Sequence, residues 1–120
     1  MEYRKLGRTQ LNSSAVGLGT WAFNSSVYGS VDKTVALKAI DAASGMGIIF
    51  FDTAPLYGTG KKDGVAEFIL GKGPRTCRKG VIFSTKFGRK PTEGNKANFN
   101  GRYARRSVEE SLQRFATDYI

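Results

Sequence analysis

The sequence contains no histidine, only one cysteine and no long apolar run. Without histidine the chain lacks the commonest general base and the commonest metal ligand, so we expect no metal centre. The single cysteine, Cys77, cannot form an internal disulfide, which is typical of a reducing compartment. No apolar stretch approaches the roughly 18 residues of a transmembrane helix. No hydrophobic segment follows the N-terminal residues, so we expect a cytoplasmic protein with neither a secretory signal nor a membrane partner.

Acidic residues are fewer than basic ones, at 10 against 19, so the net charge is +9. Residues 1–60 have a net charge of +1, whereas residues 61–120 have a net charge of +8. Such a bias is found in proteins that bind nucleic acids or phosphate ligands. Here the basic residues are scattered over predicted helices and loops, without an aromatic platform or a helix for reading bases. We therefore expect no nucleic-acid partner.

Short apolar runs alternate with amphipathic segments along the chain. Strands are predicted near residues 15–19, 48–52 and 81–86, and helices near residues 33–45, 63–71 and 102–116. The centres of the predicted strands, Val16, Ile49 and Ile82, are 33 residues apart, which is the length of a βαβ unit. Strands that alternate with helices predict a parallel α/β sheet.

The ends of the chain and the apolar stripes complete the expected fold. Residues 3–6 and 11–18 flank a turn at residues 7–10 and predict an N-terminal hairpin, and Tyr119-Ile120 predicts the start of another strand. The run Ile48–Phe51 is typical of a strand that is buried on both faces. Helical spacing predicts these buried stripes: Ala36, Leu37, Ile40 and Ala43; Val65, Phe68 and Ile69; Ala104, Val108, Leu112 and Phe115.

Chemically useful side chains lie where the predicted strands end. Trp21, Asp52 and Lys86 each follow a different strand, and Tyr57 lies in the loop after Asp52. A carboxylate at the end of a buried strand is costly without a partner, and the Lys86 ammonium is the best candidate. An acid, a phenol and an amine form a constellation suited to proton transfer. We expect Asp52 and Lys86 within about 4 Å of each other, the Tyr57 hydroxyl close to the ammonium, and Trp21 on the same cavity.

Two parallel architectures fit this pattern. Residues 17–22 match the glycine motif of doubly wound dinucleotide-binding folds, but that motif opens a helix directly, and here Trp21 and a polar loop follow it. A (β/α)8 TIM barrel instead places its chemistry in loops after several strands. The sequence favours the barrel, with residues 1–120 as the N-terminal part of a single barrel domain. This part is a hairpin followed by about three and a half βα units, whose open edges predict marginal stability and self-association.

Five motifs together resemble the N-terminal half of the aldo-keto reductases, in that family's order and spacing. The resemblance extends from Arg4 to Ile120. The motifs are Arg4-Lys5-Leu6-Gly7-Arg8-Thr9, Gly17-Leu18-Gly19-Thr20-Trp21, Phe51-Asp52-Thr53-Ala54-x-x-Tyr57-Gly58, Ser84-Thr85-Lys86-Phe87 and Ser107-Val108-Glu109-Glu110-Ser111-Leu112.

The resemblance implies a reductase that uses NADP or NAD to interconvert carbonyl compounds, sugars being one option, and alcohols. It implies that Tyr57 is the general acid for carbonyl reduction, that the Lys86 ammonium stabilises its phenolate, and that Asp52 holds the ammonium. A phenol with a pKa near about 10 is a poor donor at neutral pH without such a cation, so the physical chemistry agrees with these roles.

The same resemblance implies cofactor contacts and a missing partner. Gly19, Thr20 and Trp21 are expected beside the nicotinamide and the substrate, and Asp52 is counted with them. The family's fourth site residue, a histidine, is expected shortly after Tyr119, beyond the last residue of this chain. We therefore expect residues 1–120 to show no turnover by themselves.

Two other functions are open at this point. Barrel proteins that resemble the β-subunits of potassium channels serve as regulatory binding partners, although we expect no regulatory extension before the predicted hairpin. A non-functional fragment is the third option. The continuation of the reading frame after Ile120 would separate these options, because a histidine and phosphate-binding motifs are expected there in an enzyme.

Overall fold

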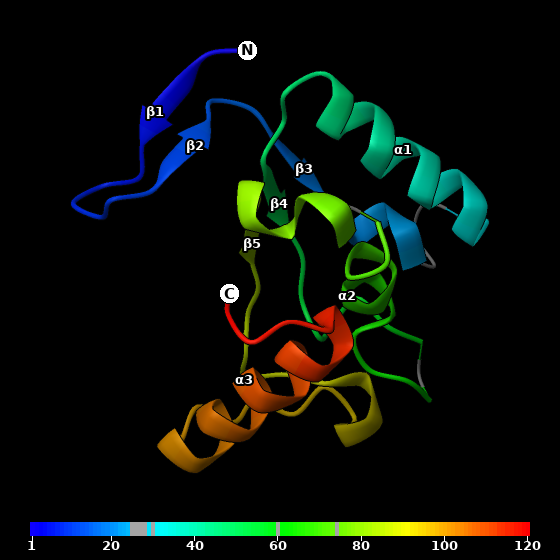
Figure 1. Cartoon of the computed structure of the whole chain (residues 1–120). Helices are drawn as coiled ribbons and strands as arrows, with labels where there is room; N and C mark the ends of the chain where they lie inside the picture. Colours follow the sequence, from blue (N-terminus) through cyan, green and yellow to red (C-terminus); the bar gives the residue numbers. More distant parts are fainter. Residues whose placement is uncertain (25–28, 30, 60, 74) are drawn as a thin grey trace.

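A computed structural model shows three parallel strands with helices packed against them (Figure 1). It describes residues 1–24, 29, 31–59, 61–73 and 75–120. In these residues no helix is both long and apolar enough to cross a membrane.

The N-terminal hairpin is present as predicted. Strand β1 (Tyr3–Lys5) pairs antiparallel with β2 (Asn12–Ser14), so the second strand ends earlier than expected. The Tyr3 hydroxyl donates to the carbonyl of Gly47 at 3.0 Å. The Ser14 hydroxyl accepts from the backbone amides of Ile49 and Phe50 at 3.1 and 3.3 Å. These bonds attach the hairpin to the segment that leads into the central strand.

The three-stranded sheet has the order β3-β4-β5 and is parallel throughout, as predicted. Its strands are β3 (Gly17–Gly19), β4 (Phe50–Asp52) and β5 (Ile82–Ser84). The register places Gly19, Asp52 and Ser84 side by side. The carboxyl ends of the three strands therefore meet at one edge of the sheet.

The two faces of the sheet differ in burial. Leu18, Phe51 and Phe83 are aligned in register, and Phe51 and Phe83 are buried in the core formed with the helices. Alternation along the strand puts Phe50 on the opposite face, where it is only partly buried. The prediction that Ile48–Phe51 is buried on both faces is therefore wrong, because the described helices cover one face only.

The helices are close to their predicted positions. They are α1 (Lys33–Gly45), α2 (Val65–Leu70) and α3 (Gly101–Phe115), with 3-10 turns at Trp21–Asn24, Arg75–Gly80 and Pro91–Glu93. The Asp32 carboxylate caps α1 by accepting from the amide of Thr34 at 2.7 Å. The Asn100 side chain caps α3 by accepting from the amide of Tyr103 at 2.8 Å. Both caps satisfy amides that otherwise lack a helical partner.

The buried face of α3 agrees with the predicted apolar stripe at Phe115 but differs from it elsewhere. Tyr103, Ser107, Ser111 and Phe115 are buried, whereas Val108 is 43% exposed. Ala104 and Leu112 are also only partly buried. The physical reason is the partner helix, because α2 presents a fully buried carboxylate and α3 turns polar side chains toward it.

Phe68 of α2 is a second exception, since it is 37% exposed rather than buried. Three ammonium groups, those of Lys33, Lys62 and Lys72, lie within 5.5 Å of the centre of its ring. Such cation–π contacts stabilise an aromatic ring at the surface. The Phe68 ring therefore contacts ammonium groups at the surface instead of packing in the core.

The strand predicted at Tyr119-Ile120 is absent, and both residues lie outside any strand. The guanidinium of Arg78 stacks 3.9 Å from the centre of the Tyr119 ring and donates to the Tyr119 carbonyl. The Tyr119 hydroxyl donates to the Arg78 carbonyl at 3.1 Å. These contacts fix the segment without a strand partner, and desolvation by burial lowers the pKa of Arg78.

Candidate active site

Asp52 and Lys86 form an ion pair at the carboxyl edge of the sheet. The Lys86 ammonium donates to Oδ1 of Asp52 at 2.6 Å and to the carbonyl of Thr53 at 2.9 Å. The predicted approach of these two residues is confirmed. The side chains of Lys86 and Asp52 are 48% and 37% exposed, respectively, so the pair is open to a ligand.

The second oxygen of Asp52 has a partner that the sequence analysis missed. The hydroxyl of Ser84 donates to Oδ2 of Asp52 at 3.3 Å. The signal for Ser84 is its spacing, because it precedes Lys86 by two residues and so shares a strand face with it. Asp52 is therefore held by two side chains from β5 and the residues after it.

Tyr57 is brought back to this edge by a tight loop. Its amide donates to the carbonyl of Ala54 at 3.0 Å, and its carbonyl accepts from the amide of Ala66 at the start of α2. The Lys86 ammonium lies 5.2 Å from the centre of the Tyr57 ring. The ammonium is therefore a neighbour of the Tyr57 ring, and its described hydrogen bonds go to Asp52 and Thr53. The predicted closeness of the Tyr57 hydroxyl to the ammonium stays a prediction.

Trp21 lies beside Tyr57. The two ring centres are 6.4 Å apart with an angle of 29° between the ring planes, and Trp21 is 48% exposed. Trp21 therefore lies beside the phenol, whereas its place on the same cavity as Asp52 and Lys86 stays a prediction. Its exposed ring gives the site a flat apolar surface next to the phenol.

Gly19 and Thr20 occupy different environments in the predicted cofactor segment. A Cβ atom built on Gly19 would meet open space, so this strand end leaves room above it. Thr20 is fully buried, and both its hydroxyl and its amide donate to the Asp52 carbonyl, at 3.1 and 2.9 Å. In this structure Thr20 therefore positions the backbone of Asp52 and offers no exposed surface to a cofactor.

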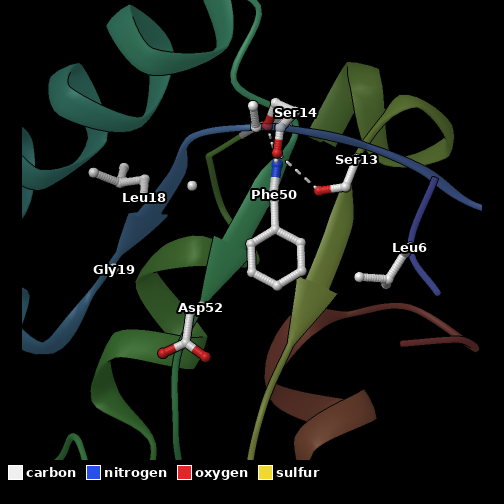
Figure 2. Close-up of a pocket in the computed structure, with 9 residues that line it drawn as sticks. Leu6, Ser13, Ser14, Leu18, Gly19, Phe50 and Asp52 are labelled. Atoms are coloured by element: carbon white, nitrogen blue, oxygen red, sulfur yellow. Dashed lines mark hydrogen bonds between the residues drawn. The ribbon is translucent and has the colours of Figure 1, made fainter. Parts of the chain in front are cut away.

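A hollow of about 390 Å³ lies over the uncovered face of the sheet. Figure 2 shows Phe50 and Asp52 extending from β4 toward this side, with Leu6 and Ser13 of the hairpin region across from them. The hollow therefore extends from the hairpin to the Asp52 carboxylate, along the face of the sheet that the helices leave uncovered.

A second pocket, of about 220 Å³, adjoins the phenol. Its lining includes Leu56, Tyr57, Lys86, Phe87 and Phe99. Ligand pockets are commonly apolar with a few polar groups that orient the ligand. Here the apolar walls come from two loops, and the polar groups are the phenol and the ammonium.

A buried polar network supports β5 from the helical side. Glu67 is fully buried and accepts from Thr85, Ser111 and Arg114 at 2.6, 2.8 and 2.5 Å. Thr85 directly precedes Lys86. Thr85 contacts the buried Glu67, and Lys86 contacts Asp52 at the sheet edge. The network satisfies a carboxylate that would be costly to bury alone and fixes the backbone that carries Lys86.

The geometry suits proton donation to a developing oxyanion. A partly exposed phenol lies beside an ammonium whose charge is balanced by a carboxylate, as charge stabilisation in catalysis requires. Nothing in the described site depends on a histidine or a cysteine. The arrangement is therefore that of an acid supported by a cation, next to an apolar pocket.

Comparison with known proteins agrees with this geometry. The chain is 38% identical over its whole length to the aldo-keto reductase YhdN of Bacillus subtilis and 39% identical to L-galactose dehydrogenase of Arabidopsis thaliana. It is 34% identical to the NADH-specific methylglyoxal reductase of Escherichia coli, over 96% of its length. The chain spans 36%, 36% and 38% of these relatives, respectively.

Solved structures show the same relation. A Pseudomonas aeruginosa protein described as an aldo-keto reductase matches 98% of this chain with a TM-score of 0.84 and 35% identity. The glycerol dehydrogenase of Gluconobacter oxydans matches with a TM-score of 0.75 and 28% identity. The chain covers 44% and 37% of these structures. The sequence profile of the aldo/keto reductase family matches residues 15–120. The chain thus belongs to the aldo/keto reductase family, and its hairpin, strands and helices are part of a (β/α)8 barrel.

Proposed function

We propose that residues 1–120 carry the proton-donating part of an oxidoreductase that interconverts carbonyl compounds and alcohols with NADP or NAD. The observation that supports this most directly is the ion pair of Asp52 and Lys86, 2.6 Å long, beside the ring of Tyr57. Its position at the carboxyl edge of parallel strands is where barrel enzymes place their chemistry. We propose further that these residues belong to a single barrel domain.

The roles follow from the charge that develops on the substrate. A bound nicotinamide cofactor would supply the hydride, which reaches the carbonyl carbon and leaves negative charge on oxygen. Tyr57 donates a proton to that oxygen, and the Lys86 ammonium stabilises the phenolate that remains. Asp52 keeps the ammonium in place, and Ser84 and Thr20 keep Asp52 in place.

The described residues fit the nicotinamide end of such a cofactor. The half-exposed ring of Trp21 beside Tyr57 provides a flat apolar surface, and Gly19 leaves open space above the end of β3. The phosphorylated cofactor is the first choice from the family resemblance. The Escherichia coli relative is NADH-specific, so both cofactors belong in the test.

The first experiment replaces the matching part of the Escherichia coli relative with this chain. The chimera is assayed for reduction of methylglyoxal by NADH, alongside the intact relative. We expect turnover that falls about 10²- to 10⁴-fold in Tyr57→Phe, the usual contribution of a general acid. A folded, active chimera that is indifferent to Tyr57→Phe would refute the assigned role of the phenol.

The second experiment assays the 120-residue chain alone with NADPH and with NADH. We expect no turnover above that of Tyr57→Phe, because the family's histidine and its later nucleotide-binding loops lie outside this sequence. Measurable carbonyl reduction by the chain would show that three side chains at one sheet edge suffice for the reaction.

A further inference from the structure

The loop after β5 is built onto the active-site edge through a glycine. Gly88 has a φ of +112°, a conformation that side chains rarely adopt, and a Cβ atom there would collide with the ring of Phe99. The absence of a side chain at Gly88 therefore creates the space in which Phe99 lies. The amide of Asn98 donates to the Gly88 carbonyl at 2.9 Å, which holds the Phe99 segment in this place.

Two aromatic rings form the wall of the pocket beside Tyr57. Phe87 and Phe99 meet edge to face, with ring centres 6.0 Å apart and an angle of 72°. Phe87 and Phe99 are 45% and 67% exposed, respectively, although they pack against each other, and both line the pocket. With Leu56 they give an apolar lining next to the phenol and the ammonium.

Arg89 adds a positive charge to the same pocket. It contributes to the lining, and its Nη1 donates to the carbonyl of Asn95 at 2.8 Å. A guanidinium has five N–H donors, so this bond positions the group while leaving its charge at the pocket. An anionic group on a ligand would find a geometrically suited partner there.

The pocket volume sets the size of the group that fits. A cavity of about 150 Å³ is large enough to bind benzene, and this pocket measures about 220 Å³. One aromatic ring with a small substituent therefore fills it. A two- or three-carbon carbonyl compound would leave the walls formed by Phe87 and Phe99 in contact with water.

We propose that the substrate is an aryl carbonyl compound with an anionic substituent, whose ring occupies the pocket of Leu56, Phe87 and Phe99 and whose charge pairs with Arg89. This proposal rests on the proposed function, because it places the carbonyl next to Tyr57. It assigns substrate specificity to Phe99 and Arg89, which lie outside the proton-donating residues.

The binding test uses the 120-residue chain and requires no turnover. Trp21 is the only tryptophan and stacks on Tyr57, so its fluorescence reports on this edge. The probes are 4-(hydroxymethyl)benzoate, benzyl alcohol and 2-propanol. We expect the benzoate to bind most tightly, benzyl alcohol more weakly, and 2-propanol to leave the fluorescence unchanged over the same range.

Variants identify the pocket as the binding site. Phe99→Ala should weaken both aromatic probes about tenfold, the scale expected for loss of an aromatic contact. Arg89→Gln should weaken only the benzoate, about three- to fivefold, as for an exposed ion pair. Phe68→Ala removes another exposed phenylalanine, which is not part of the pocket lining, and should change neither affinity. Circular dichroism spectra verify that each variant is folded.

Two results would overturn the proposal. Equal effects of Phe99→Ala and Phe68→Ala would show that the rings bind elsewhere, and absence of binding by both aromatic probes would exclude the pocket. The chimera separates this proposal from the proposed function. Reduction of methylglyoxal without a preference for 4-carboxybenzaldehyde refutes the substrate class alone. Probe binding that depends on Phe99 supports the pocket even if no carbonyl compound is reduced.

Discussion

The structure contains the same constellation of charges twice, in two different environments. At the sheet edge, the Asp52–Lys86 pair spans 2.6 Å, and the ammonium lies 5.2 Å from the ring of Tyr57. Beside α3, the Glu93–Arg106 pair also spans 2.6 Å, and the guanidinium lies 5.1 Å from the ring of Tyr103. The exposed fractions are also similar, at 37% and 48% for the first pair and 37% and 53% for the second.

The two phenols, by contrast, differ in accessibility. Tyr57 lines a pocket and is partly exposed, whereas Tyr103 is 4% exposed and faces the core side of α3. Burial raises the pKa of Tyr103, and the nearby Glu93 carboxylate raises it further, so this phenol retains its proton. A carboxylate, a cation and a tyrosine at these distances therefore do not define an active site unless the phenol can reach a ligand.

The largest expected effect contrasts the two cations in the chimera. Lys86→Met should lower the rate of carbonyl reduction about 10²- to 10⁴-fold, because the phenolate left by proton donation loses its stabilising charge. Arg106→Met removes the equivalent cation beside Tyr103 and should leave the rate within about threefold of the parent. Steady-state kcat and KM measured for both variants test the comparison. Equal losses would show that the two constellations are not functionally distinct.

The second prediction concerns the stability contributed by a buried ion pair, Glu67–Arg114, in contrast to the two exposed pairs. Glu67 is fully buried and Arg114 is 17% exposed, so Glu67→Gln leaves a poorly solvated guanidinium without its closest anion. We expect the free energy of unfolding to fall by about 3 kcal/mol, measured by urea unfolding followed by circular dichroism. The double variant with Arg114→Met should lose less than the single variant, because no unpaired charge remains. A loss below about 1 kcal/mol in the single variant would contradict this account.

Much of the fold could be predicted because it depends on local sequence. The apolar runs around Phe51 and Phe83 predicted β4 and β5, and the capping side chains of Asp32 and Asn100 predicted where α1 and α3 begin. The pairing of Asp52 with Lys86 followed from one rule, that parallel strands end at one edge. Each of these features needs only the residues of the element itself and the sheet direction.

The features that could not be predicted depend on tertiary partners. The face that α3 buries is chosen by Glu67 on another helix, and no spacing within α3 indicates this. Phe68 stays at the surface because lysines from separate segments surround it. The pocket wall at Phe99 depends on the positive φ of Gly88. A glycine in a polar loop can adopt this conformation, but the sequence does not indicate that it does.

The third prediction uses pH to distinguish the buried phenol. The pKa of Tyr103 is raised in the folded chain, so its stabilising contribution is complete below the unfolded value of about 10. That contribution is lost as pH rises through the folded value, since the unfolded chain releases the proton first. Tyr103→Phe cannot show this loss, so above about pH 10 the free energy of unfolding of the parent should fall relative to that of the variant. Denaturant unfolding of both proteins at stepwise pH measures the change. A difference that stays constant with pH would contradict a raised pKa.

The smallest expected effect concerns the stability of the two exposed pairs. Ion pairs with both partners partly exposed contribute at most about 1 kcal/mol, because solvent screens the attraction and the side chains lose freedom. Asp52→Asn and Glu93→Gln should therefore each change the free energy of unfolding by less than about 1 kcal/mol, and these small changes should shrink further in high salt. Urea unfolding at low and high ionic strength measures both variants side by side. The pair at Asp52 also positions the ammonium beside Tyr57, so in the chimera Asp52→Asn should lower the rate of reduction while Glu93→Gln leaves it unchanged. A stability loss at Asp52 as large as that of Glu67→Gln would mean that the exposed pair is a structural element of the sheet edge, and the contrast between the two constellations would then lie in folding rather than in chemistry.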